Sequence, residues 1–265
     1  MSRPSLHHPG AHELGQNFLR DRGTICRIVD LVARTDGDLV EWGAGDGALT
    51  LPLSRLDRPL EAVEIDPRAV DALSRRVPPH VTVRCGDILR HAPPAGSTVV
   101  SNLPYHLTTP ALRHLLSAEG WTRAVLVTQW EVARKRAGVG GATMMTAQWW
   151  PWVEVALDRR IPASAFRPRP SVDSGLLILQ RRRQPHLDRR DRHAYQQFIR
   201  RVFTGPGRGL EQVLRRGGGM TARAARRFGD RHGYSPRALP RDVDPAHWPG
   251  AFVLSLGARH RTPRA

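Results

Sequence analysis

Residues 39–47 read Leu-Val-Glu-Trp-Gly-Ala-Gly-Asp-Gly, an apolar run that leads directly into three alternating glycines. The run at 39–42 predicts a short buried strand. The glycines predict a turn whose backbone can pass close to a ligand, because glycine adopts positive φ angles freely. Their spacing differs from the dinucleotide-binding pattern Gly-x-Gly-x-x-Gly. By itself the motif fits a plain turn as well as a ligand-binding loop.

Strand and helix patterns alternate along residues 21–129. Apolar runs predict four more strands, and helical periodicity is found between the strands and before the first; the strands are 60–65, 81–85, 97–100 and 124–129, and the helices 21–32, 70–77 and 110–117. This alternation predicts an α/β fold with a parallel sheet covered on both faces. Ligands of such sheets bind beyond the carboxyl ends of the strands. Polar or glycine-rich stretches follow strands one to four, which predicts the functional site there.

Two carboxylates are placed where a nucleoside would need them. Glu64 ends the second strand, about 20 residues after the glycine motif, where an acid can accept both hydroxyls of a ribose. Asp87 follows the third strand and could accept from an adenine amino group. The only lysine, Lys135, comes too late to bind a phosphate at the glycine loop. A nucleoside cofactor without phosphates indicates S-adenosylmethionine and requires no metal; the alternative is three unrelated polar turns.

The fourth strand runs into Ser101-Asn102-Leu103-Pro104-Tyr105-His106-Leu107. The Asn102 side-chain oxygen and the Leu103 carbonyl could accept hydrogens from an adenine amine and direct its lone pair to a methyl donor. Pro104 would fix the turn and Tyr105 would stack on the base, while no general base is assigned. Phe166, beside two prolines, is a candidate second aromatic wall for an unstacked base. The alternatives are an ordinary turn at 102–105 and an ordinary core position for Phe166.

Composition indicates a polyanionic partner. The 265 residues carry a formal net charge of +17, which favours nucleic acid. The 40% hydrophobic content suffices for a core. Cys26 and Cys85 form neither a disulfide framework nor a metal site and are expected to pack as small hydrophobes. No apolar run reaches the length of a membrane span and no signal peptide is recognisable, so we expect a cytoplasmic protein that does not bind membranes.

The predicted domain organisation has four parts. Residues 1–12 form a flexible arm, 13–183 the cofactor-binding catalytic domain, 184–258 a helical RNA-binding domain and 259–265 a tail. His7, His8 and His12 belong to the arm, and no acid or cysteine is placed to complete a metal site with them.

Six motifs occur in the order found in the rRNA adenine N6-methyltransferases, which the chain resembles over residues 13–215. They are Gly15-Gln16-Asn17-Phe18-Leu19, Glu41-x-Gly43-x-Gly45-x-Gly47, Glu64-Ile65-Asp66, Gly86-Asp87, Asn102-Leu103-Pro104-Tyr105 and Phe166-x-Pro168-x-Pro170-x-Val172-Asp173-Ser174. The resemblance implies a class I, Rossmann-like methyltransferase sheet with a small helical C-terminal domain. It also implies cofactor roles that the residues alone would not show. The expected cofactor-binding residues are Gln16, Asn17, Leu19, Gly43, Gly45, Glu64, Ile65, Asp87, Ile88 and Asn102.

Within that superfamily the chain resembles the Erm branch in residues 128–135 and 202–210. The resemblance implies methylation of one adenine of 23S rRNA, which would block binding of macrolides, lincosamides and streptogramin B. The expected RNA contacts are Arg134, Lys135, Arg136 and Arg208, and we expect a monomer. Two alternatives are a small-subunit 16S rRNA adenine dimethyltransferase and a non-catalytic nucleic-acid-binding protein on the same scaffold.

Overall fold

The computed structural model describes residues 17–259, which form two compact units. The first unit contains residues up to 131 and residues 157–178, and the second contains 132–156 and the chain from 179 onward. The predicted arm at 1–12, the cofactor residue Gln16 and most of the predicted tail lie outside the described residues.

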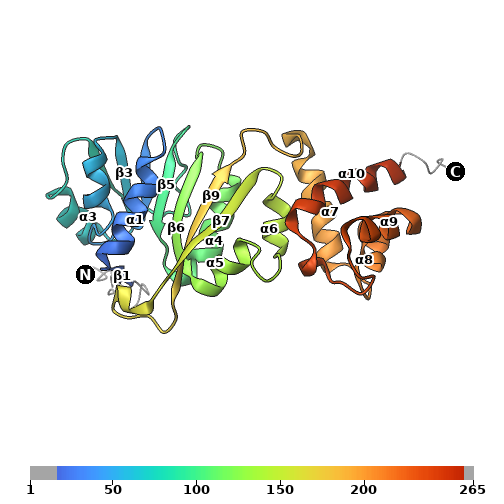
Figure 1. The fold of residues 1–265 in the computed structure, drawn as a ribbon. Helices are drawn as coiled ribbons and strands as arrows, with labels where there is room; N and C mark the ends of the chain where they lie inside the picture. The colour runs from blue at the N-terminus through green and yellow to red at the C-terminus, as the bar shows by residue number, and fades with distance from the viewer. Residues whose placement is uncertain (1–16, 260–265) are drawn as a thin grey trace, which may run out of the picture. The chain divides into compact units, whose positions relative to one another are not determined.

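The central element is a seven-stranded sheet in the order β4-β3-β2-β5-β6-β9-β7 (Figure 1). The strands are β2 (Leu39–Trp42), β3 (Leu60–Glu64), β4 (Val81–Cys85), β5 (Thr98–Asn102), β6 (Arg123–Gln129), β7 (Val153–Ile161) and β9 (Ser174–Arg181). The pairs β3–β4, β2–β3, β2–β5 and β5–β6 are all parallel. The predicted parallel α/β sheet is therefore confirmed for its first five strands.

The chain reverses its direction of travel across the sheet at β2. From β2 it proceeds outward through β3 to the edge strand β4, and it then returns to β5 on the other side of β2. Trp42 is paired with both Val63 and Ser101, so β2, β3 and β5 end at the same edge of the sheet. Such a reversal opens a crevice at the carboxyl ends of the strands, where ligands of these folds bind.

Helices cover both faces of this sheet. Helix α1 (Arg22–Ala33) begins at Asp21, whose carboxylate accepts a 2.7 Å hydrogen bond from the Thr24 amide as an N-cap. Its buried side chains pack in one cluster with Leu39, Leu60, Val100 and Val125 of the strands. Helix α3 (Pro67–Ser74) instead contributes Leu73 to a smaller cluster with Ala62. Two further helices are α2 (Thr50–Leu53), with Pro52 near its start, and α4 (Thr108–Ser117).

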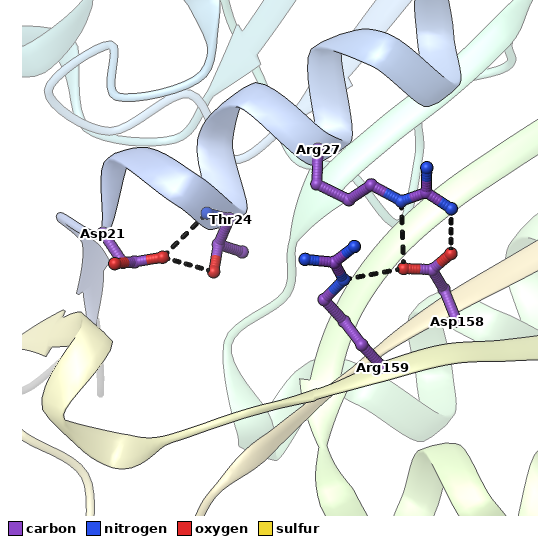
Figure 2. Close-up of polar contacts among 5 residues, drawn as sticks. All are labelled: Asp21, Thr24, Arg27, Asp158 and Arg159. Carbon is purple, nitrogen blue, oxygen red and sulfur yellow. Dashed lines mark hydrogen bonds and ion pairs between the residues drawn. The ribbon is translucent and has the colours of Figure 1, made fainter.

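An ion pair fastens α1 to β7 across the first unit, as Figure 2 shows. The Arg27 guanidinium donates to both carboxylate oxygens of Asp158, with Nη2–Oδ1 at 2.5 Å and Nε–Oδ2 at 3.2 Å. Arg159 Nε also donates to Oδ2, at 3.0 Å. These bonds hold the pKa of Asp158 below its usual value, and the bond from Arg27 contributes most. The ion pair therefore holds α1 in place, and α1 closely follows the expected site residues Asn17 and Leu19.

A two-stranded sheet lies next to the N-terminus of α1. Strand β1 (Phe18–Leu19) pairs antiparallel with β8 (Phe166–Arg167), which places Leu19 opposite Phe166. The Arg20 amide extends the contact with a 2.8 Å bond to the Ala165 carbonyl. The pairing was not predicted, because two-residue strands carry no periodic signal.

Six α-helices of the described chain contribute to the second unit: α5 (Trp130–Arg136) from residue 132 onward, and all of α6 (Met144–Trp149), α7 (Arg192–Thr204), α8 (Leu210–Arg216), α9 (Ala222–His232) and α10 (Trp248–Arg259). Aromatic side chains form its core: Tyr195 and Phe198 of α7 contact Phe252 of α10 at ring distances of 5.5 and 5.7 Å. The unit begins earlier than the predicted boundary at 183/184. Residues 132–156 join it because α6 packs on α7, where Tyr195 donates a 2.8 Å bond to the Ala147 carbonyl.

Both cysteines are exposed, so the expectation that they pack as small hydrophobes is wrong. Cys26 follows Ile25 on α1 and points away from the stripe formed by Ile28 and Val32. Cys85 is the last residue of β4, the edge strand.

Candidate methyl-transfer site

A pocket lies at the carboxyl edge of β2, β3 and β5, where the chain reverses across the sheet. Among the residues that the structure describes, its lining contains three carboxyl side chains and no lysine or arginine. The described residues that line it are Asn17, Phe18, Leu19, Glu41, Gly43, Ala44, Gly45, Asp46, Ala48, Leu49, Glu64, Asn102, Leu103, Pro104 and Tyr105. Of the expected site residues, the structure thus brings together Asn17, Leu19, Gly43, Gly45, Glu64 and the stretch 102–105, and their binding of cofactor or substrate stays a prediction.

The glycine loop needs glycine at two positions on this pocket. Gly43 and Gly45 have φ angles of +76° and +54°, which side chains of L-residues rarely tolerate. A Cβ on Gly43 would meet no atom within 4 Å, so its Cα faces open space. A Cβ on Gly45 would lie 3.0 Å from the Phe18 ring. The loop is therefore a surface of bare backbone toward a ligand, backed by an aromatic ring.

Glu64 holds this loop in place. Its Oε2 accepts from the Gly45 amide at 2.8 Å, and its Oε1 accepts from the amides of Ile65 and Asp66 at 2.9 and 3.0 Å. A carboxylate has about four acceptor sites, so these three bonds leave one directed elsewhere. The side chain is buried and lines the pocket. The acceptance of ribose hydroxyls stays a prediction, and the structure adds a second role as the anchor of the loop.

Glu41 is a carboxyl group of the pocket to which the sequence reasoning gave no role. It is buried on β2, and Thr50 donates a 2.5 Å bond to its Oε2. Burial raises the pKa of Glu41 to about 8; the Thr50 bond opposes this shift, and the nearby carboxylates of Glu64 and Asp46 add to it. The sequence did contain a signal for this role. Glu41 lies in the buried strand, one residue before its end, and it begins the motif Glu41-x-Gly43-x-Gly45-x-Gly47.

The raised pKa of Glu41 predicts a pH-dependent stability. Between pH 4.5 and about 8 the folded protein keeps a proton on Glu41 that the unfolded chain has lost, so its contribution to the free energy of unfolding falls as pH rises through that window. Glu41→Gln carries no such proton. Urea unfolding at a series of pH values should show the wild type losing stability relative to Glu41→Gln toward pH 8. A difference that stays constant with pH would contradict the shift.

Two further lining residues, Phe18 and Asp46, also went unassigned from sequence, although both lie inside motifs that were recognised. Asp46 accepts a 2.5 Å bond from Arg20 through Oδ2, while its Oδ1 is buried with no hydrogen-bond partner among the described residues. An unsatisfied carboxylate oxygen in a pocket favours a ligand with hydrogen-bond donors or positive charge.

The Asn102 carboxamide is oriented by the N-terminal segment. Its Nδ2 donates a 2.8 Å bond to the backbone carbonyl of Asn17. Because that bond fixes which end of the amide is the donor, Oδ1 is directed away from Asn17. Among residues 17–259 no hydrogen bond to Oδ1 is found. The pocket therefore contains a side-chain oxygen that is held in one orientation and able to accept.

The residues after Asn102 form a rigid turn. The Leu103 amide donates to the Val127 carbonyl of β6 at 3.1 Å, and Pro104 has an extended conformation with φ −54° and ψ 133°. Tyr105 begins a short 3₁₀ helix, and its hydroxyl lies 2.8 Å from Ser174 Oγ. Burial, with a contribution from Asp173, raises the pKa of Tyr105 against the opposing Ser174 bond. The phenol is therefore neutral at physiological pH.

Four predicted site residues are placed outside the pocket lining. Phe166 has 0% exposure and packs in the main core cluster, which favours the core alternative over a stacking wall. Asp87 Oδ1 accepts from the Leu89 amide at 2.8 Å, and Ile88 is buried beside it. Ile65 is 54% exposed directly after Glu64, an unusual position for a large apolar side chain that would suit packing on a flat base.

The predicted RNA-binding residues lie in the second unit. Helix α5 (Trp130–Arg136) ends with Arg134, Lys135 and Arg136. Arg136 donates to Thr143 Oγ1 at 2.8 Å, whereas the side chains of Lys135 and Arg208 are exposed. Their contact with RNA stays a prediction.

The donor set of the pocket fits S-adenosylmethionine. Its sulfonium and ammonium groups are cationic, which matches the carboxylates Asp46 and Glu64 and the absence of basic side chains among the described lining residues. A pyrophosphate would meet repulsion there. Gly43 and Gly45 would lie against the cofactor, and Glu64 would accept from its ribose. The bound group supplies an electrophilic methyl.

Comparisons with known proteins define the family. A sequence model described as "Ribosomal RNA adenine dimethylase" matches residues 8–229. The mycinamicin-resistance protein MyrB of Micromonospora griseorubida is 48% identical over 92% of this chain and 79% of its own length. An rRNA adenine N-6-methyltransferase of Corynebacterium diphtheriae is 47% identical over 81% of this chain and 85% of its own.

A solved structure agrees with these relatives. The crystal structure of the 23S rRNA methyltransferase ErmE superposes with a TM-score of 0.82 at 32% identity, covering 89% of this chain and 98% of that one. The fold and the pocket thus define a class I S-adenosylmethionine-dependent methyltransferase. The chain belongs to the ribosomal RNA adenine dimethylase family and is of the Erm type. The predicted family, fold class, enzyme class and cofactor are confirmed.

Between residues 17 and 259 no helix has the length and apolar character needed to cross a membrane. Over the same residues no group of three or more His, Cys, Asp or Glu side chains could hold a metal ion.

Proposed function

We propose that this enzyme transfers a methyl group to N6 of one adenine of 23S rRNA and thereby confers resistance to macrolides, lincosamides and streptogramin B. The observation that carries the chemistry is the Asn102 amide, held by the Asn17 carbonyl with its oxygen free to accept. The choice of RNA is supported by the likeness to MyrB, a mycinamicin-resistance protein, and to ErmE, a 23S rRNA methyltransferase.

In the proposed mechanism Asn102 Oδ1 and the Leu103 carbonyl accept the two hydrogens of the adenine amine. These bonds favour a pyramidal nitrogen and direct its lone pair, otherwise delocalised into the ring, at the methyl group. Pro104 keeps the two acceptors at a fixed spacing, and the neutral Tyr105 ring stacks on the base. The rate gain comes from orientation and electrostatics, because the methylated amine loses its proton readily without a general base.

The substrate is proposed to be held by arginine-rich surfaces. Arg134, Lys135, Arg136 and Arg208 would contact phosphates, so binding should weaken steeply with salt. The target base would come from an unpaired region, since it must leave its stack to enter the pocket. We further propose that the enzyme is a cytoplasmic monomer, in the compartment of its RNA substrate.

The test uses purified protein, labelled S-adenosylmethionine and protein-free 23S and 16S rRNA. The expected result is label in 23S rRNA. Label only in 16S rRNA would instead support the small-subunit dimethyltransferase. No label in either RNA, with RNA binding retained, would support a non-catalytic binding protein.

A further inference from the structure

Trp130 and Arg160 form a stacked pair that the proposed mechanism does not use. The Arg160 guanidinium carbon lies 5.2 Å from the centroid of the Trp130 ring. Trp130 is the first residue after β6, and Arg160 is near the end of β7. The Arg160 side chain is 60% exposed, and its guanidinium lies over the indole ring. The guanidinium therefore contacts an aromatic ring and is still accessible to a ligand.

Asp173 fixes the geometry of this pair. Its Oδ2 accepts from Arg160 Nε at 2.7 Å, and its backbone carbonyl accepts from the Trp130 amide at 2.9 Å. Its Oδ1 accepts from the Ala163 amide at 2.9 Å. Asp173 therefore holds both the backbone of Trp130 and the Nε edge of the Arg160 guanidinium in place. Such fixed planes reduce the entropy lost when a flat ligand stacks on them.

A short chain of contacts connects the pair to the methyl-acceptor pocket. Ser174, the residue after Asp173, lies 2.8 Å from the hydroxyl of Tyr105, which lines the pocket. The same segment therefore positions the Tyr105 ring on one side and the Trp130–Arg160 stack on the other. All of these residues belong to the first unit.

We propose that the Trp130–Arg160 stack holds an unpaired nucleobase that neighbours the target adenine in the RNA. Proteins recognise single-stranded RNA by stacking splayed bases on aromatic rings and guanidinium planes. A base beside the extruded adenine is itself unstacked on one side, and the stack replaces the lost neighbour. The guanidinium also contributes positive charge next to the phosphates. The inference rests on the proposed function, since it assumes an RNA substrate with an extruded adenine.

The test uses a short RNA hairpin with one unpaired adenine and the fluorescent base 2-aminopurine on its 5′ or 3′ side. Binding of the wild type should quench one of the two probes, because stacking quenches 2-aminopurine. Arg160→Lys keeps the charge and a partner for Asp173 but loses the plane. It should abolish the quenching and raise KM for the hairpin on the order of 10-fold, with kcat nearly unchanged.

Two controls separate this role from a structural one. Arg159→Lys, next in sequence and paired with Asp158, should leave quenching and KM unchanged. The affinity of Arg160→Lys for S-adenosylhomocysteine should equal that of the wild type if the fold is intact. Unchanged quenching and KM in Arg160→Lys would overturn the proposal. So would a fall in kcat at constant KM, which would assign the pair to positioning Tyr105.

Failure of the proposed function can be told apart from failure of this inference. Quenching depends on binding alone and is measured without a methyl donor. If the wild type quenches the probe but methylates neither the hairpin nor rRNA, the proposed activity is refuted, while the proposed binding of a base by the Trp130–Arg160 stack still holds. If the wild type methylates the hairpin without quenching either probe, the proposed binding of a base by the Trp130–Arg160 stack is refuted, while the proposed activity still holds.

Discussion

Asn102→Ala should reduce kcat by about 100-fold or more, the typical loss when one preorganised hydrogen-bonding group is removed from a transition state. The variant loses the Oδ1 acceptor as well as the anchor to the Asn17 carbonyl. RNA affinity should stay near that of the wild type, because the substrate is held mainly through its phosphates. Single-turnover methylation of rRNA, together with filter binding, measures both quantities.

Asn102→Asp sharpens this prediction. An aspartate keeps an acceptor but has no hydrogen to donate to the Asn17 carbonyl, so its carboxylate would be repelled from the position that the amide occupies. We expect it to be nearly as inactive as the alanine variant. His106→Ala, an exposed neighbour outside the pocket lining, is the matched control and should behave as the wild type. Asn102 variants within about threefold of wild-type kcat would contradict the role assigned to this residue.

Glu64→Gln should weaken S-adenosylhomocysteine binding by at least about 10-fold, since bonds to a charged group contribute about 1.5–3 kcal/mol each. The carboxylate now accepts from the Gly45 amide through one oxygen and from the amides of Ile65 and Asp66 through the other. A glutamine has one oxygen, so its NH2 group would face either the Gly45 amide or the other two, and donors would oppose donors there. The glycine loop should loosen as a result. Isothermal titration gives the affinity, and thermal unfolding gives the accompanying loss of stability.

Glu61→Gln provides the control for this second prediction. Glu61 lies on the same strand, but its carboxylate bonds to His91 at 3.0 Å and Arg84 at 3.2 Å, away from the pocket. A glutamine oxygen can accept from one of these two donors, and the bond that is lost lies away from the pocket. Cofactor-analogue affinity should therefore be unchanged. Equal losses in the two variants would indicate a general effect on the strand and would count against a specific role of Glu64.

The sheet and the main part of the pocket could be predicted from sequence because both have local signals. Alternation of apolar strands with helical periodicity identified β2 to β6. The carboxyl ends of parallel strands share one edge, so Gly43, Glu64 and Asn102 were expected to lie together. The pairing of β2 with both β3 and β5 produces that convergence.

The rest of the site depends on contacts between distant residues. The bond from Asn102 to the Asn17 carbonyl joins positions 85 apart, and backbone carbonyls leave no mark in a sequence. The pairing of β1 with β8 explains why Phe166 belongs to the core: opposite Leu19, it joins the main cluster and has no exposed surface. The raised pKa of Glu41 likewise depends on how the surrounding segments bury its carboxyl group and bring Glu64 and Asp46 near it.

The proposed role of the pocket is to direct an adenine amino nitrogen at the methyl donor. It is tested most directly by digesting enzyme-treated 23S rRNA to nucleosides and identifying the methylated product by mass spectrometry against standards. We expect methylation at N6 of adenosine, as the mono- or dimethyl product, and none elsewhere. Methylation at N1 or C2 of adenosine, or on another nucleoside, would contradict it.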